Sequence, residues 1–71
     1  MNKQTIGTNA GTIWKLLSGR TKWSVESIHQ ATALPIEEIY LALGWLAREN
    51  KIEMTTINDT AYFYLSLEPY F

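Results

Sequence analysis

The 71-residue sequence contains no cysteine, one histidine and one aspartate. The absence of cysteine excludes disulfide frameworks, zinc sites with thiolate ligands and cysteine nucleophiles. A single histidine with scattered acidic residues falls short of the ligand set that zinc requires. We therefore expect neither a metal nor another cofactor.

Long apolar runs are also missing. Residues 1–5 are polar, and no stretch has the length or hydrophobicity of a signal peptide or a membrane span. The lack of cysteine is compatible with a reducing compartment. The sequence thus predicts a soluble, cytoplasmic protein that does not contact a membrane.

An excess of positive charge is absent as well. Six lysines and arginines stand against seven acidic residues, which gives a formal net charge of −1. Domains that bind nucleic acid are usually basic, because cationic side chains release counterions from the phosphates. Binding to DNA would therefore require a locally basic face.

What the sequence does have is apolar material for a core. Hydrophobic residues make up 46% of the chain, including three tryptophans, four tyrosines and two phenylalanines. A chain of this length can bury one core but is too short for two domains. We expect residues 1–71 to form a single domain.

The N-terminal third predicts an amphipathic helix over residues 5–18, which ends at Gly19. Two glycines inside it, Gly7 and Gly11, each cost about 1 kcal/mol relative to alanine. They suggest that another backbone approaches closely, either in an internal helix contact or in a dimer groove. The residues expected to face the core are Ile6, Ala10, Ile13 and Leu17.

Ser24 is the expected N-cap of a second, short helix over residues 25–32, and Leu34-Pro35 ends that helix. A third helix is predicted over residues 35–50, with Asn50 as a left-handed C-cap. In the second helix the expected inward residues are Val25, Ile28, Ala31 and Thr32. In the third they are Ile36, Ile39, Leu43 and Leu46.

The C-terminal third predicts a β-hairpin. Its strands cover residues 51–57 and 61–67, around a turn at residues 58–60. Because side chains alternate along a strand, Tyr62 and Tyr64 should share the outer face. Pro69 should stop the second strand. The residues expected to face the core are Ala61, Phe63, Leu65 and Leu67.

A helix-turn-helix pair followed by a hairpin is typical of an α+β winged helix-turn-helix fold. The alternative is a three-helix bundle with a frayed C-terminus. Residues 6–14 (IGTNAGTIW) and 40–52 (YLALGWLARENKI) resemble signature stretches of a small, uncharacterised prokaryotic winged helix-turn-helix family. The resemblance implies the fold but brings no catalytic residue, ligand or cofactor. It implies DNA binding only by analogy with other proteins of this fold.

The outward face of the third helix differs from that of a DNA-reading helix. It carries one cation, Arg48, and two glutamates in its first turn that would repel phosphates. Leu41 and Trp45 form an apolar ridge there, which favours association with protein, most simply as a twofold homodimer. Alternatively, the first helix, the hairpin or Tyr70-Phe71 covers this ridge. The predicted interaction residues are Glu38, Leu41, Trp45 and Arg48.

No catalytic constellation is visible. His29 is better explained as a half-buried packing residue or a surface group than as a base, since active sites need several converging groups. Glu37 and Glu38 are adjacent on a helix and point in different directions. We therefore predict a non-enzymatic interaction module that self-associates. The alternative is a DNA-binding transcriptional regulator whose dimer combines cations from both subunits, namely Lys15, Arg20, Lys22 and Arg48.

Overall fold

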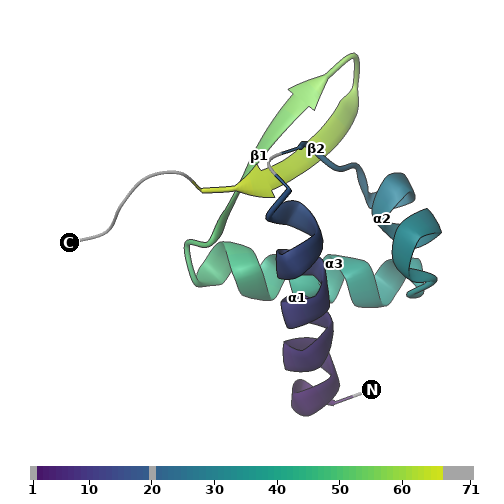
Figure 1. Cartoon of the computed structure of the whole chain (residues 1–71), viewed down its shortest axis with the longest axis vertical. Coiled ribbons are helices and arrows are strands. Elements are labelled where there is room, and N and C mark those ends of the chain that lie inside the picture. The colour runs from purple at the N-terminus through teal and green to yellow at the C-terminus, as the bar shows by residue number, and fades with distance from the viewer. Residues whose placement is uncertain (1, 20, 67–71) are drawn as a thin grey trace.

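The computed structural model describes residues 2–19 and 21–66, which form three helices followed by a two-stranded antiparallel hairpin. In Figure 1, α1 crosses α3, α2 lies at one side, and the hairpin, which follows α3 in the chain, lies beyond the C-terminal end of α1. This is the predicted winged helix-turn-helix fold, and the paired hairpin excludes the three-helix bundle. The elements are α1 (Lys3–Leu17), α2 (Val25–Thr32), α3 (Ile36–Arg48), β1 (Ile52–Ile57) and β2 (Thr60–Leu65).

Helix α1 begins two residues earlier than its apolar pattern predicts, because Asn2 caps it. The Asn2 Oδ1 accepts a hydrogen bond from the backbone N–H of Thr5 at 2.8 Å. Asparagine is among the best N-cap residues, since it pairs an amide that the helix itself cannot. Ile6 is only half-buried. The buried residues of α1 are Asn9, Ala10, Ile13 and Leu17.

Helix α2 has the predicted bounds and the predicted cap. Ser24 Oγ accepts from the N–H of Ser27 at 3.1 Å, and Ser27 Oγ accepts from the N–H of Ser24 at 2.9 Å. This reciprocal capping box fixes where the helix starts. Ile28 is fully buried, but Ala31, which we expected to face inward, is exposed. The buried face of α2 has Ile28 at its centre and half-buried residues one turn before and after it. Ala31 lies beyond the edge of this face.

The turn between α2 and α3 uses an unusual residue. Ala33 adopts the left-handed conformation with φ of 62°, and its N–H donates to the carbonyl of His29 at 2.8 Å. A Cβ atom in this conformation crowds the backbone, which is why glycine normally occupies it.

Ala33→Gly should therefore raise the free energy of unfolding by about 1 kcal/mol, because glycine adopts a positive φ at no steric cost. Equilibrium denaturation in urea would measure the difference. Gly19→Ala is a useful comparison, since Gly19 has no positive φ. If Ala33→Gly and Gly19→Ala changed the free energy of unfolding by the same amount, the turn at Ala33 would not be strained.

Helix α3 ends earlier than residue 50 because a capping motif follows it. The N–H of Lys51 donates to the carbonyl of Leu46 at 3.0 Å, and the N–H of Asn50 donates to that of Ala47 at 3.0 Å. Asn50 has φ of 59°, which confirms the predicted left-handed residue. This pair of bonds is the Schellman motif, which satisfies carbonyls at a helix end.

The core lies where α3 packs against α1. The most buried α3 residues are Ile39 and Ala42, both fully inaccessible. Ile36, expected to face inward, is instead 37% exposed. The buried face of α3 is therefore rotated from the predicted one, so that it includes Ala42 and leaves out Ile36. The full set of buried apolar residues is Ala10, Ile13, Leu17, Ile28, Ile39, Ala42, Leu43, Leu46, Ile52 and Phe63.

The hairpin turn has two residues rather than three. Asn58 and Asp59 have φ of 51° and 68°, while Thr60 already pairs with Ile57. Positive φ at both positions is the geometry of a type I′ turn, which matches the twist of a hairpin. Phe63 is buried, as predicted. The other residues from 61 to 65 are all half-buried, so burial along β2 does not alternate as expected, although Ala61 and Leu65 pack against the core. Residues 67–71, including Leu67, Pro69, Tyr70 and Phe71, lie outside the described residues.

A short extended segment pairs with the other side of β2. The N–H of Trp23 donates to the carbonyl of Phe63 at 2.9 Å, and the N–H of Phe63 donates to that of Trp23 at 2.7 Å. Strand β2 therefore lies between Trp23 and β1. This bridge connects the hairpin to the segment that precedes α2.

Candidate interaction surface on the third helix

One stripe of α3 faces away from the core. Glu37, Leu41, Gly44 and Arg48 follow one another at intervals of four, three and four residues, so they share a face of the helix. All four are exposed, and Trp45 lies beside them. We call these five residues the α3 stripe.

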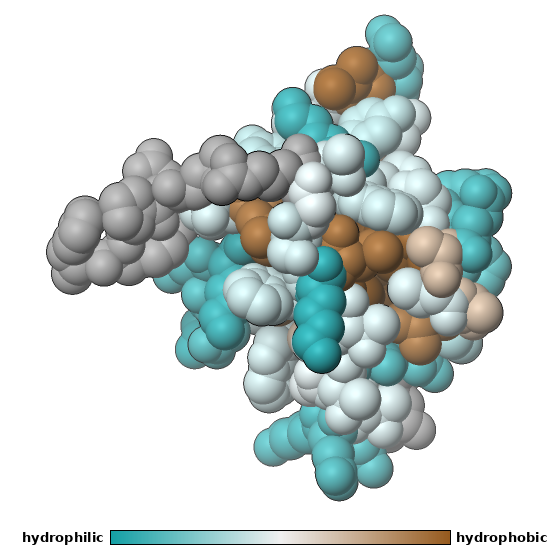
Figure 2. All heavy atoms as spheres, in the orientation of Figure 1, coloured by the Kyte–Doolittle hydropathy of each residue, from teal (hydrophilic) through white to brown (hydrophobic). Residues whose placement is uncertain are grey.

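The apolar part of the α3 stripe is open. Leu41 is 45% exposed and Trp45 is 43% exposed. The alternative in which α1 or the hairpin covers this ridge is therefore wrong for the described residues. Tyr70 and Phe71, the other suggested cover, lie outside those residues. Figure 2 shows hydrophobic residues reaching the surface in the middle of another face and near the wing tip, so apolar exposure is not confined to α3.

Glu38 does not belong to this surface. Its side chain is half-buried, and its Oε1 accepts a hydrogen bond from Asn9 Nδ2 at 2.9 Å. Asn9 is only 8% exposed, so this bond satisfies a buried amide and fastens α1 to the first turn of α3. Although the sequence placed Glu38 outward, it faces α1. Glu37 is the carboxylate on the outward face.

The glycines of the helices have free space above them. A Cβ atom built on Gly7, Gly11 or Gly44 would meet no atom within 4 Å. The expectation that Gly7 and Gly11 allow a close internal helix contact is therefore wrong. The packing of this chain does not require a missing side chain at these positions.

The cations proposed for DNA lie on different parts of the surface. Lys15 is exposed in the last turn of α1, and Arg48 ends α3. Lys22 Nζ lies 5.2 Å from the centre of the Tyr64 ring. Lys51 Nζ lies 6.0 Å from the centre of the Trp14 ring, a contact at the base of the wing that the sequence did not indicate. Arg20 is outside the described residues.

Comparison with known proteins identifies the family. The family described as Winged helix-turn-helix domain (DUF2582) matches residues 1–65. The chain belongs to this family. The solution NMR structure of protein BT2368 from Bacteroides thetaiotaomicron is 35% identical, with a TM-score of 0.83 over 93% of this chain and 80% of that chain. No curated protein matches the sequence. The family is a domain of unknown function, so its membership settles the fold and leaves the activity open.

The histidine of this DUF2582 domain has a structural role. His29 is exposed, and its Nδ1 lies 2.6 Å from the carbonyl oxygen of Leu34. A carbonyl only accepts, so Nδ1 carries the proton and closes the turn between α2 and α3. In residues 2–19 and 21–66, no three histidine, cysteine, aspartate or glutamate side chains could hold a metal ion together. Over the same residues, no helix is long and apolar enough to cross a membrane.

Proposed function

We propose that this winged helix-turn-helix domain is a non-catalytic interaction module that forms a twofold dimer through the α3 stripe. The observation that carries the proposal is that the stripe is complementary to itself. Glu37 and Arg48 lie at its two ends, eleven residues or about 16 Å apart along the helix. When two copies of α3 run antiparallel, Glu37 of one copy meets Arg48 of the other, twice in each dimer.

The apolar residues pair about the same axis. The midpoint of Glu37 and Arg48 in the sequence is also the midpoint of Leu41 and Gly44. In the antiparallel pair, Leu41 of one copy therefore packs over Gly44 of the other, where a Cβ atom would have met open space. A large side chain such as that of Leu41 needs a small residue opposite it when two helices approach closely. Trp45, next to Gly44 in the sequence, then borders this contact and adds an aromatic anchor to it.

The charges also select the orientation. A parallel pair would place Glu37 opposite Glu37 and Arg48 opposite Arg48, and like charges across an interface cost free energy. The antiparallel pair replaces both repulsions with attractions. A heterologous contact does not benefit from this symmetry, which is why we favour a second copy as the partner.

DNA binding has less support from the residues. The outward face of α3 offers bases one cation, Arg48, and the turn of the wing carries Asp59. The cations at the base of the wing, Lys22 and Lys51, lie over aromatic rings rather than along α3. A specific complex usually needs several phosphate contacts on one continuous face.

Charge reversal tests the dimer. Glu37→Arg and Arg48→Glu should each weaken dimerisation about tenfold, because either exchange turns both pairs into repulsions. The double variant should return to within about threefold of the native chain, since it restores opposite charges. Sedimentation equilibrium over a concentration series would give the constants.

A double variant no better than the single ones would contradict the antiparallel pairing. A native chain that stays monomeric would contradict the dimer itself. Titration with duplex DNA at low and moderate salt covers the alternative. Affinity whose logarithm falls linearly with the logarithm of salt concentration would favour the DNA-binding regulator.

Exchanging two glycines separates helix stability from dimer packing. Gly11→Ala and Gly44→Ala should each raise the stability of the monomer by about 1 kcal/mol, because alanine is the better helix former. Only Gly44→Ala should weaken the dimer, since its methyl group occupies the place of Leu41 from the second copy. Urea denaturation at low concentration and sedimentation at high concentration measure the two effects. A stronger dimer in Gly44→Ala would contradict the close packing.

A further inference from the structure

Strand β1 is an unprotected edge of the sheet. Its partner β2 is flanked by β1 on one side and by Trp23 on the other, so β1 has no second neighbour among the described strands. The pairing with β2 runs without a bulge from Ile52 to Ile57. The strand contains neither proline nor lysine, the residues with which proteins usually protect an edge. An edge of this kind is a template for a further strand.

The register identifies the backbone groups that are free to pair. Both backbone groups of Phe63 bond to Trp23, so they point away from β1. Met54 stands opposite Phe63, and in an antiparallel ladder its N–H and C=O therefore point away from β2. Because the pattern repeats every second residue, the same holds for Ile52 and Thr56. Three donors and three acceptors thus face outward along β1.

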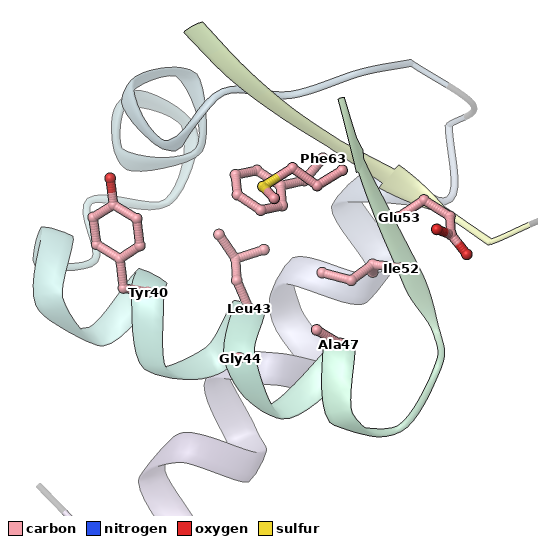
Figure 3. A pocket seen from close by; sticks show the side chains of 8 residues that line it. Tyr40, Leu43, Gly44, Ala47, Ile52, Glu53 and Phe63 are labelled. Carbon is pink, nitrogen blue, oxygen red and sulfur yellow. The ribbon is translucent and has the colours of Figure 1, made fainter. Parts of the chain in front are cut away.

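An apolar cleft lies directly beneath this edge. It has a volume of about 560 Å³ between α3 and β1. Figure 3 shows Tyr40 and Leu43 on α3, with Phe63 on the opposite wall and Glu53 pointing away on the other side of β1. The cleft is lined by Tyr40, Leu43, Gly44, Ile52, Met54 and Phe63, among others. Side chains of an added strand that share a face with Met54 would enter it.

A second cavity lies next to this cleft, and its charged lining residues are acidic. It has a volume of about 610 Å³, shares Tyr40 and Phe63 with the first and reaches the start of α2. Its charged lining residues are Glu26 and Asp59, and neither described lining includes a lysine or an arginine. Phosphates would be repelled here, whereas a cationic side chain would be attracted.

We infer that β1 and the cleft beneath it form a second binding site, which takes an extended peptide segment of another protein by β-strand addition. The segment carries apolar side chains at alternate positions and lysine or arginine at its N-terminal end. Main-chain hydrogen bonds to β1 supply affinity, and the cleft selects the alternate side chains. This site is distinct from the proposed dimer surface, although Gly44 borders both.

Antiparallel pairing fixes how such a peptide lies. Residues directly opposite Ile52, Met54 and Thr56 direct their amides toward β1 and their side chains toward the cleft. In a peptide of sequence KKVTVTV, the three valines take these positions. The two lysines then extend past Thr56 to the tip of the wing, next to Asp59 and Glu26. Polar threonines face solvent.

The synthetic peptide KKVTVTV is the probe, with binding followed by amide chemical shifts of the full chain. Shifts should concentrate at Ile52, Met54 and Thr56. Methylating the three valine amides should weaken binding about tenfold or more, because it removes the hydrogen bonds to β1. Methylating the two threonine amides is the matched control and should have little effect. The peptide EEVTVTV should bind about tenfold more weakly than KKVTVTV.

Exchanges at one residue of the chain test the same geometry. Met54→Pro removes the outward N–H but no bond to β2, because proline is tolerated where the N–H faces away from the ladder. It should weaken peptide binding about tenfold, whereas Met54→Leu keeps the amide and the apolar side chain and should stay within about threefold. Asp59→Asn retains a residue that tolerates positive φ and should weaken KKVTVTV but not EEVTVTV.

Equal binding of the two methylated peptides, or shifts centred away from β1, would overturn the inference. Concentration-dependent shifts at Met54 without peptide would also overturn it, since a second copy would then occupy the edge. Repeating the titration with Trp45→Glu separates the two proposals. Peptide binding should persist in that variant whether or not the native chain forms the α3 dimer.

Discussion

Trp45→Glu should convert the proposed dimer into a monomer at all concentrations accessible to light scattering. Trp45 is 43% exposed in the single chain and borders the contact of Leu41 with Gly44 in the proposed dimer. Truncating an aromatic anchor typically costs about 2 kcal/mol or more, and the twofold axis doubles the loss. The exchange also brings two carboxylates into a desolvated contact without partners. Light scattering during gel filtration would show the mass halved relative to the native chain.

Met54→Glu is the matched control for this experiment. Met54 is 62% exposed, more than Trp45, but it lies on β1 outside the α3 stripe. A general loss of surface hydrophobicity would affect both variants, whereas the proposed interface predicts that only Trp45→Glu dissociates. Both exchanges are at exposed sites, so circular dichroism should show folded chains. If Met54→Glu dissociated the dimer and Trp45→Glu did not, the interface would have to be placed on β1.

The local signals in the sequence were sufficient for the order of the elements. Ser24 predicts the start of α2 because a hydroxyl at that position can pair an otherwise free amide, and the structure has that bond. Alternation in β2 predicts that Phe63 faces the core, because side chains on a strand have a period of two. Asn50 predicts the end of α3 for a similar local reason. Each of these features depends on residues within one turn or one strand.

The rotation of α3 could not be predicted in the same way. Apolar residues occur around most of this helix, so periodicity alone does not distinguish the buried face from the exposed one. The structure buries Ala42 and leaves Ile36 and Tyr40 exposed. The bond between Asn9 and Glu38 joins residues 29 positions apart, and no local pattern indicates it.

For a related reason, the sequence could not predict that β1 has the free edge. The hairpin alone gives two strands with one free edge each, and the sequence does not show which edge is covered. Trp23 covers β2 through bonds across forty residues of sequence. Only this tertiary pairing leaves β1 open next to α3. The surfaces proposed to bind partners therefore depend on packing between elements rather than on motifs within them.

Phe63→Ala should lower the free energy of unfolding by about 3–5 kcal/mol, the usual cost of deleting a buried phenylalanine. A domain of this size has a total stability of only about 4–10 kcal/mol, so most of it would be lost. Phe63 is 9% exposed, packs in the core and holds Trp23 through both backbone groups. The same ring forms the wall shared by both cavities. Urea denaturation followed by tryptophan fluorescence would measure the change.

Tyr62→Ala provides the comparison, because Tyr62 is the adjacent residue on the opposite face of β2 and is only half-buried. Its removal should cost no more than about 1.5 kcal/mol, since it leaves no cavity in the core. Similar losses in the two variants would mean that the hairpin does not pack on the helices through Phe63. The cleft under β1 would then lack its wall. Both the proposed peptide site and the placement of Phe63 on the core face of β2 would be wrong. A much larger loss of stability in Phe63→Ala than in Tyr62→Ala would support both claims, because the ring that stabilises the wing also shapes the cleft.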